Sequence, residues 1–377
     1  MKPGFSLYLD ALRLTAAIAV LLGHLAHARF TQGNLQALRD LNIASDAVVV
    51  FFVLSGLVIA YAAERDGTLG RFAFNRTTRL FSVIIPALLL TLVFDGIGTR
   101  VDMSAYPKDF YSDISAWEVL LRGLTFSNEW VGLTDRVRIG TNGPLWSLSY
   151  EAIYYAVFAS CVFLRGNMRI AVIGVMIILV GLPILALAPC WFLGVWAWRQ
   201  VKSKRAMSRT SAWGLAITAP VFFVASKWIG LPQQLTEWTM ALVAPTNLHI
   251  LLAYSDEVFW NTLLAGSVAL HLIGVSSIVR NLSRVYTDNR SSRAVKWTAG
   301  ASFSIYVVHY PTLHLIDALF DLTSKYAGLL ALIGTLCTCL VFAQIFERSL
   351  ASVRRALVDS ITKFSLGRTP PSIEATK

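Results

Sequence analysis

The sequence has 377 residues, of which 55% are hydrophobic and only 15% are charged. Soluble domains carry about 25% charged residues, and a core formed by this length of chain could not bury so much apolar surface. The composition therefore excludes an ordinary soluble enzyme and predicts an all-α, polytopic membrane protein. The net charge is +11, but the basic residues form short clusters between apolar runs. That pattern indicates membrane topology and no nucleic-acid partner.

Apolar runs long enough to cross a bilayer follow one another along the chain. The first run follows Lys2 and resembles a secretion signal, but its length of about 20 residues and the charges within it favour an uncleaved membrane helix. A shorter Trp-rich run is counted as a span because it directly follows its neighbour. The predicted spans, about ten in number, are 7–28, 44–63, 80–98, 145–165, 169–187, 189–200, 211–230, 259–279, 299–320 and 327–347.

Loop charge orients these spans, because Lys and Arg accumulate in cytoplasmic loops. A cytoplasmic N-terminus places the basic clusters at 64–79 and 280–296 inside together with the C-terminal tail. A weak eleventh run at 237–254 would move the cluster at 280–296 outside, so we predict that 231–258 is external or re-entrant. Ten spans place both termini on the cytoplasmic side of the membrane and make 99–144 external.

A single membrane domain is expected over residues 1–350, followed by a partly disordered cytoplasmic tail at 351–377. We see no internal repeat and no low-complexity linker. The cysteines lie in or beside apolar runs without metal-ligand spacing, which predicts packing residues and no metal site. Phosphate-binding loops and nucleophile elbows are also missing from the sequence. The four cysteines are Cys161, Cys190, Cys337 and Cys339.

The first run carries ionisable side chains that a simple anchor would not need. Asp10 lies one turn from Arg13 and can pair with it. Arg13 and His24 are eleven residues apart, which returns to within about 20° of the same helix face, about 16 Å further along the axis. With Ala17 and His27 they form one predicted stripe. A structural ion pair and a buried histidine are the alternative, but charges within a membrane usually mark a pathway or a site.

The next two runs carry a small-residue motif and an arginine pair. Ser55 and Gly56 in the second run predict close helix packing. Arg76 and Arg79 precede the third run at a spacing that puts both guanidiniums on one side. They are either ordinary cytoplasmic charge or a clamp for phosphates, because guanidinium donors match phosphate oxygens in bidentate geometry.

The fourth run opens with Trp146, Ser147, Tyr150 and Glu151 near its predicted outer end. A carboxylate inside a membrane helix needs a partner. Since His24 is predicted at a similar depth, we expect Glu151 to pair with it, raise its basicity and fix its tautomer. A structural pair or a water-exposed carboxylate is the alternative.

The ninth run places Ser302, Tyr306 and His309 at helical spacing, and Pro311 frees a backbone carbonyl there. Hydrogen bonding within the core is the alternative to a functional role. We take Tyr306 and His309 as possible acceptor contacts or as support for catalytic side chains. The same prediction applies to Ser55, Trp146, Ser147 and Tyr150.

Five segments together resemble the acyltransferase-3 family of bacterial membrane proteins. They occur in the family's order and cover the chain from residue 7 to about 347. At Ala11-Leu12-Arg13-Leu14 the chain departs from the family, which often has Gly after the arginine. We expect no additional periplasmic esterase-like domain, so that transfer is completed within the membrane domain. The segments are Leu9–Arg13 with its spacing to His24, Phe51–Gly56, Arg76 with Arg79, Trp146–Glu151 and Ser302–Pro311.

The resemblance implies transfer of an acyl group, most often acetyl, from coenzyme A to a hydroxyl of a cell-envelope or exported carbohydrate. It implies that His24 is the catalytic histidine, that Arg13 is its partner on the first helix, and that Arg76 and Arg79 contact the donor from the cytoplasm. Acyl-CoA is then a co-substrate and no bound cofactor is expected. The other expected partners are a carbohydrate or lipid-linked glycan acceptor and membrane lipid.

The sequence hypothesis therefore assigns catalysis to Asp10, Arg13, His24 and Glu151. Coenzyme A would place its phosphates on the arginines, and His24 would remove the proton of the acceptor hydroxyl at the outer face. An acyl-His24 intermediate is an open variant. The rival class is a proton-coupled transporter or flippase of a glycan or small organic solute, because ionisable residues inside membrane helices also suit a carrier.

Overall fold

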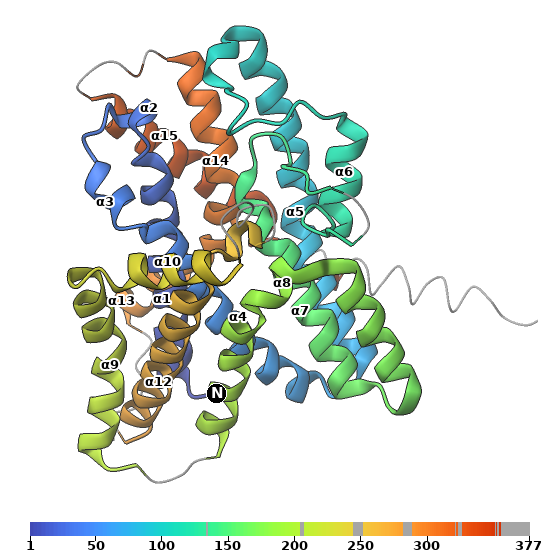
Figure 1. The fold of residues 1–377 in the computed structure, drawn as a ribbon, viewed down its shortest axis with the longest axis vertical. Helices are drawn as coiled ribbons and strands as arrows, with labels where there is room; N and C mark the ends of the chain where they lie inside the picture. The colour runs from blue at the N-terminus through green and yellow to red at the C-terminus, as the bar shows by residue number, and fades with distance from the viewer. Residues whose placement is uncertain are drawn as a thin grey trace, which may run out of the picture.

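The computed structural model describes residues 1–132, 135–203, 207–243, 252–281, 289–320, 322, 326–350, 352 and 354–355. Across these ranges the chain consists of helices joined by loops and short helical turns, without a β-strand (Figure 1). The predicted all-α class is therefore confirmed for the part of the chain that is described.

Within the described ranges, six helices are long and apolar enough to cross a membrane. The bent pair of α9 (Arg209–Trp228) and the following helix makes a seventh candidate if it is one span. The protein is therefore a multi-pass membrane protein, although about ten spans are not confirmed. The six are α1 (Pro3–Leu25), α4 (Ile43–Asp66), α5 (Leu69–Val101), α8 (Gly166–Lys202), α12 (Val258–Asn281) and Ala327–Glu347, which joins α15 (Ala327–Phe342) to the turn η4 (Ala343–Glu347).

Two predicted spans fall outside this set because polar side chains make their 18-residue helices less apolar than the others. The run 145–165 forms α7 (Trp146–Phe163), and the run 299–320 forms α14 (Ser302–Leu319). Buried polar residues of α14 include two histidines, His309 and His314. The same polar residues that lower the apolar character of these helices make them candidates for a site.

The predicted runs 169–187 and 189–200 both belong to α8, and the break between them is wrongly placed. The helix is interrupted at Gly181, which has φ 75° and ψ −177°, and the chain turns sharply there (Figure 1). A Cβ atom at this position would lie 2.1 Å from Cγ2 of Val131. The turn therefore needs glycine both for its backbone angles and for the close approach of Val131.

Short elements fill the connections between the long helices. The segment 231–258 begins as α10 (Leu231–Val243), bent by 73° from α9, while its residues 244–251 lie outside the described ranges. Most of the predicted disordered tail at 351–377 also lies outside them, and the side on which each terminus lies stays a prediction. The remaining elements are α2 (Ala28–Thr31), α3 (Gln36–Asp40), η1 (Met103–Ala105), α6 (Ala116–Thr125), η2 (Gly143–Leu145), η3 (Ala253–Ser255) and α13 (Arg290–Ala299).

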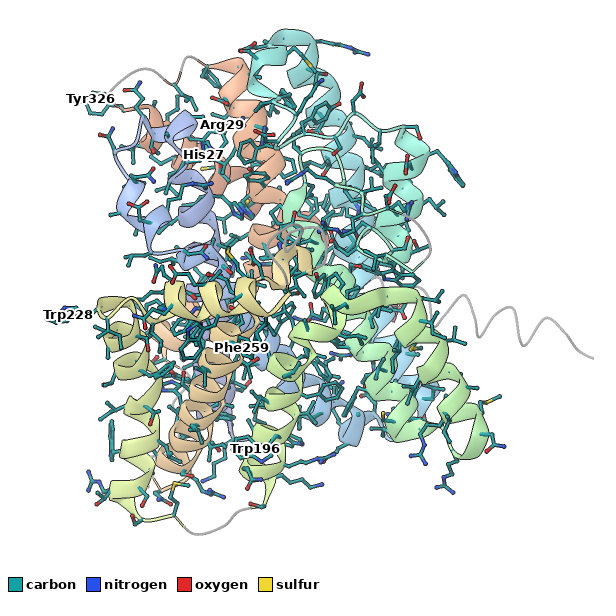
Figure 2. The ribbon with its side chains drawn as sticks, viewed as in Figure 1. His27, Arg29, Trp196, Trp228, Phe259 and Tyr326 are labelled. Carbon is teal, nitrogen blue, oxygen red and sulfur yellow. The ribbon has the colours of Figure 1, made fainter. Side chains whose placement is uncertain are left out.

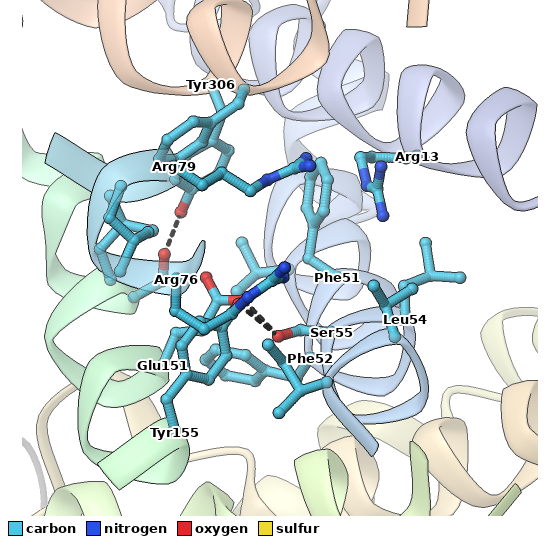
Figure 3. Close-up of a pocket in the computed structure, with 17 residues that line it drawn as sticks. Arg13, Phe51, Phe52, Leu54, Ser55, Arg76, Arg79, Glu151, Tyr155 and Tyr306 are labelled. Atoms are coloured by element: carbon cyan, nitrogen blue, oxygen red, sulfur yellow. Dashed lines mark hydrogen bonds between the residues drawn. The ribbon is translucent and has the colours of Figure 1, made fainter. Parts of the chain in front are cut away.

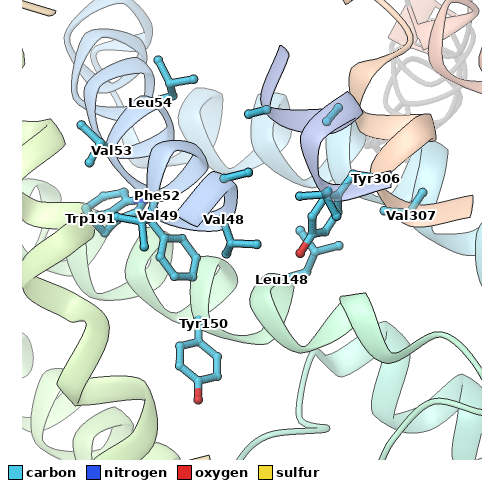
Figure 4. Packing of buried hydrophobic residues seen from close by; sticks show 14 of the residues in the cluster. Val48, Val49, Phe52, Val53, Leu54, Leu148, Tyr150, Trp191, Tyr306 and Val307 are labelled. Atoms are coloured by element: carbon cyan, nitrogen blue, oxygen red, sulfur yellow. The ribbon is translucent and has the colours of Figure 1, made fainter. Parts of the chain in front are cut away.

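Within the core, α4 and α8 pack closely against each other (Figure 4). A Cβ atom on Gly56 would lie 2.0 Å from the carbonyl oxygen of Trp191, and one on Gly194 would lie 2.0 Å from that of Val53. The two backbones are therefore in direct contact, which confirms the close packing predicted from Ser55 and Gly56.

Large apolar side chains are exposed around the perimeter. Trp228 is 87% exposed and Tyr326 is 70% exposed, and Figure 2 shows both at the outer edge of the molecule. Exposed aromatic residues of this size are unusual on soluble proteins but typical of a surface that meets lipid. Their distribution supports the membrane assignment independently of helix length.

Candidate active site

His24 forms a hydrogen bond with a second histidine. It lies in the last turn of α1, and its Nδ1 is 3.0 Å from Nε2 of His309 on α14. His309 Nδ1 lies 2.9 Å from the carbonyl oxygens of both Ile305 and Tyr306. Since carbonyls only accept, a neutral His309 carries its proton on Nδ1 and accepts the Nδ1–H of His24 at Nε2. The hydrogen bonds thus leave the Nε2 lone pair of His24 free to act as a base.

A close contact between helices positions His24. A Cβ atom at the adjacent residue, Gly23, would lie 2.7 Å from Cβ of Ala44. Glycine at this position therefore lets α1 approach the start of α4. On its other side His24 meets the ring of Tyr310 on α14, with ring centroids 4.7 Å apart. The imidazole is held between α14 and the α1–α4 contact.

Pro311 lacks an N–H and, as predicted, leaves one backbone carbonyl of α14 without a helical donor. The carbonyl left without a helical donor is that of Val307, four residues earlier. It accepts a hydrogen bond of 2.9 Å from Nδ2 of Asn142, which also donates to Oγ1 of Thr91 on α5 at 3.0 Å. The segment 99–144 is therefore bound to α14 beside His309.

Glu151 does not orient His24, so that prediction is wrong. Its Oε1 accepts hydrogen bonds from the hydroxyl of Tyr155, at 2.6 Å, and from Oγ of Ser55. These partners lie on its own helix and on α4, where Glu151 lines a different cavity from His24. A similar predicted depth in the membrane did not place the two side chains on facing surfaces.

The first cavity, here called the arginine pocket, has a volume of about 100 Å³ (Figure 3). Its described lining includes three guanidiniums, from Arg13, Arg76 and Arg79, and one carboxylate, that of Glu151. Arg13 lies 3.7 Å from Asp10, which confirms the pairing predicted for those two residues.

The arginine pocket carries positive charge that the protein does not fully compensate. The Nε atom of Arg76 is buried without a hydrogen-bond partner. Within the described residues, the ion pairs below 4 Å include neither Arg76 nor Arg79. Unpaired guanidiniums in a confined space favour an anionic ligand.

The second cavity, here called the histidine cavity, is larger, at about 670 Å³. His24 lines it together with Arg39, Arg136 and Glu257. The rings of Trp146 and Tyr254 stack in its wall, 4.5 Å apart and within 12° of parallel. A flat aromatic surface bordered by charged and amide groups suits a ligand with both apolar faces and hydroxyls.

Two carboxyl groups outside the membrane helices affect the charge near this cavity. Burial raises the pKa of Glu129 to about 7, against the opposing effect of Arg136, whose Nη1 lies 3.9 Å from it. Burial, followed by repulsion from Asp256, also raises the pKa of Glu257. Both carboxyls therefore compensate the cavity's arginines less at neutral pH than freely ionised groups would.

Tyr306 and Val48 line both cavities and so form the wall between them. The hydroxyl of Tyr306 donates to the carbonyl of Pro144 at 3.0 Å and lies 2.5 Å from Oγ of Ser147. Arg13 faces one cavity and His24 the other. His27 does not continue their predicted stripe, because α1 ends at Leu25 and His27 caps α2 instead.

The remaining predicted residues differ in how close they come to the cavities. Trp146 lines the histidine cavity, and Ser55 lines the arginine pocket. Ser147 lines the arginine pocket beside Tyr306. Tyr150 lines neither cavity. Its ring packs edge-on against Trp146, with centroids 5.1 Å apart, and stacks on Phe52, so it supports the cavity walls through these neighbours.

Sequence reasoning missed Tyr254, Tyr310, Arg39 and Arg136. Tyr310 follows His309 directly, and the helical period alone would have placed it near the same neighbours. Tyr254 belongs to a run that we interpreted as an external segment, and nothing in its spacing indicates the stack on Trp146. The two arginines lie in segments without a periodic pattern, so only the folded structure brings them to the cavity.

A multi-pass helical protein with a histidine pair beside two adjoining cavities is suited to reactions that join two substrates. The chain belongs to the acyltransferase-3 family, whose acyltransferase domain matches residues 6–348. The resemblance found in the five motifs is therefore confirmed.

Two curated relatives are similar to part of the chain. The acyltransferase MdmB of Streptomyces mycarofaciens is 31% identical over 153 residues, which is 40% of this chain and 37% of MdmB. An O-acetyl transferase of Shigella phage Sf6 is 28% identical over 148 residues, 39% of this chain and 43% of that protein. The chain thus matches less than half the length of each relative. No solved structure is significantly similar to it.

Proposed function

We propose that the protein is a membrane-embedded O-acyltransferase that moves an acyl group, most simply acetyl, from acyl-CoA to a hydroxyl of a carbohydrate or lipid-linked glycan. The observation that carries the proposal is the lone pair left on His24 Nε2 by its bond to His309, at the edge of a large polar cavity. Family membership and the O-acetyl transferase relative support the reaction class.

The donor occupies the arginine pocket in this proposal. Arg76 and Arg79 bind phosphate oxygens of coenzyme A, and Arg13, oriented by Asp10, completes the positive lining. Loop charge supports a cytoplasmic entrance for the donor. The acceptor then occupies the histidine cavity on the outer side of a bacterial inner membrane, and the two substrates meet at Tyr306.

During transfer, His24 accepts one proton and later releases it. Nε2 removes the proton of the acceptor hydroxyl, whose oxygen attacks the thioester carbonyl. When the C–S bond breaks, the coenzyme A thiolate takes the proton back from His24, and the products are an ester and free thiol. His309 stabilises the protonated imidazole by accepting its Nδ1–H throughout.

The same lone pair could attack the thioester directly, which gives the acyl-His24 variant. In that case coenzyme A would be released in a burst before any acceptor is added. Direct transfer releases it only when donor and acceptor are both present. A rapid-mixing assay of thiol release without acceptor separates the two routes.

The decisive experiment uses membranes that contain the full chain, labelled acetyl-CoA and the glycan fraction of the host. We expect His24→Ala to abolish incorporation of label while the protein remains in the membrane. His27→Ala is the matched control, because His27 lies three residues further on, lines neither cavity and should retain transfer. Wild-type turnover by His24→Ala would refute the mechanism, and solute flux without acylation would favour the carrier.

A further inference from the structure

The C-terminal segment returns to the helix that carries the donor-site arginines. Nε of Arg354 donates to Oγ1 of Thr78 at 2.9 Å, and its Nη2 donates to the carbonyl of Asn75 at 2.6 Å. Both partners belong to the turn of α5 that also presents Arg76 and Arg79 to the arginine pocket. Arg354 and Thr78 are 276 residues apart in the sequence. Only the fold therefore places Arg354 beside Arg76 and Arg79.

Arg354 joins a group of like charges. Burial lowers the pKa of Arg354, and repulsion from Arg79 and then from Arg65 lowers it further, while the carboxylate of Asp66 opposes this. Asp66 already pairs with Arg65 at 2.8 Å. Within the described chain, no ion pair below 4 Å includes Arg354. Among the groups that act on Arg354, one carboxylate, already paired with Arg65, thus stands against two other guanidiniums.

Arg29, at another place in the fold, shows how this protein holds a structural arginine. Its Nη2 donates to Asp317 at 2.9 Å and to the carbonyl of Ala105 at 2.6 Å, and it lies 3.0 Å from Nδ1 of His314. A carboxylate thus compensates the charge of Arg29. The hydrogen bonds of Arg354 fix its position without compensating its charge, an arrangement that favours a bound anion.

Coenzyme A carries phosphate at two separate places, the central pyrophosphate and the 3′-phosphate of its ribose. Arg76 and Arg79 line the pocket itself, whereas Arg354 does not line it but donates to Asn75 and Thr78 on the same turn of α5. Two adjacent groups of guanidiniums therefore match two separate phosphate groups on one ligand. Nη1 of Arg354 makes no hydrogen bond to a described residue, so this planar guanidinium can still donate to one of the two phosphate groups.

We propose that Arg354 binds the 3′-phosphate of the acyl-CoA donor and lets the protein distinguish coenzyme A from carriers that lack this group. The proposal rests on the proposed function, because it assumes an acyl-CoA donor in the arginine pocket. It assigns a specificity role to a residue of the C-terminal segment, which sequence reasoning treated as a tail.

The test compares acetyl-CoA with acetyl-dephospho-CoA, which lacks only the 3′-phosphate, in phosphatidylcholine vesicles that contain the full chain. We expect the wild type to show a KM about tenfold lower for acetyl-CoA, the effect of one charge-assisted phosphate contact. Arg354→Gln should raise the KM for acetyl-CoA to the value for acetyl-dephospho-CoA, leaving kcat and the second KM unchanged.

Arg355→Gln is the matched control, because Arg355 is the exposed neighbour and its hydrogen bond, at 3.5 Å, goes to Oγ of Ser352. It should keep the preference for acetyl-CoA. Arg354→Lys keeps the charge and should retain part of the preference, which separates binding from folding if the glutamine variant is unstable.

Three outcomes would overturn the assignment. They are an unchanged KM for acetyl-CoA in Arg354→Gln, an equal rise for both donors, or a wild type that uses both donors equally. Repeating the assay with added phosphatidylglycerol tests a lipid headgroup as the anion: if Arg354 binds that lipid instead, the difference between variants appears only when it is present. A wild type that transfers nothing from acetyl-CoA would instead contradict the proposed function.

Discussion

The arginine pocket and the histidine cavity share a wall but differ in size and charge. The first is small, at about 100 Å³, and its described lining has three guanidiniums against one carboxylate. The second is about 670 Å³ and mixes stacked aromatic rings with both signs of charge. A confined cationic space selects a ligand by its negative charge, whereas a wide aromatic cavity selects by shape and hydrogen bonding. Ligands of opposite character can therefore bind on either side of Tyr306.

After the loss of His24 itself, the largest expected effect comes from His309, which supports His24 without lining the histidine cavity. His309→Ala removes the acceptor of the His24 Nδ1–H and should lower kcat about a hundredfold with both KM values unchanged. His309→Gln offers an amide oxygen in place of Nε2 and should restore part of kcat, which a purely structural role would not predict. Full activity of His309→Ala in a membrane assay would show that His24 needs no partner.

An intermediate effect should follow from removing a positive charge from the arginine pocket. Arg76→Gln takes away a buried guanidinium with no ion pair and should raise the KM for acetyl-CoA about tenfold, leaving the acceptor KM unchanged. Arg71→Gln, on an exposed position of the same helix, is the control and should change neither constant. A rise in the acceptor KM instead would contradict the assignment of donor and acceptor to separate cavities.

The smallest effect is expected from the aromatic wall of the histidine cavity. Tyr254→Ala removes one of two stacked rings and should raise the acceptor KM about fivefold, corresponding to about 1 kcal/mol. The donor KM should not change, because Tyr254 does not line the arginine pocket. Trp228→Ala removes an exposed perimeter ring as a control. A change in the donor KM for Tyr254→Ala would indicate that the cavities act as one.

The course of the helices was largely predictable, because apolar runs, prolines and glycines act locally. The contact at Gly56 and the carbonyl freed by Pro311 both appear where the sequence placed them. The break at Gly181 was missed because the surrounding residues are uniformly apolar, so composition gives no boundary. The required glycine is explained by Val131, which is distant in sequence.

Residue types in the site were easier to predict than their partners. His24, His309 and the arginine pair stood out because polar groups inside apolar helices are costly. Pairing depends on which helix faces face each other, and that is set by packing across the whole bundle. The sequence therefore predicts a pair of Glu151 with His24, whereas Glu151 is bonded to Ser55 and Tyr155. The position of Arg354 depends on a contact between distant parts of the chain that no local pattern encodes.

The wall between the two cavities, formed by Tyr306 and Val48, has a thermodynamic consequence. The hydroxyl of Tyr306 is bound to Pro144 and Ser147 at the start of α7, the helix whose Trp146 lines the histidine cavity. Any movement of Tyr306 that admits the proposed thioester breaks these bonds and loosens the surface proposed to bind the acceptor. Binding of a ligand in the arginine pocket is thus linked to the shape of the histidine cavity, and linkage of this kind is reciprocal. Each ligand then changes the affinity for its partner by the same factor.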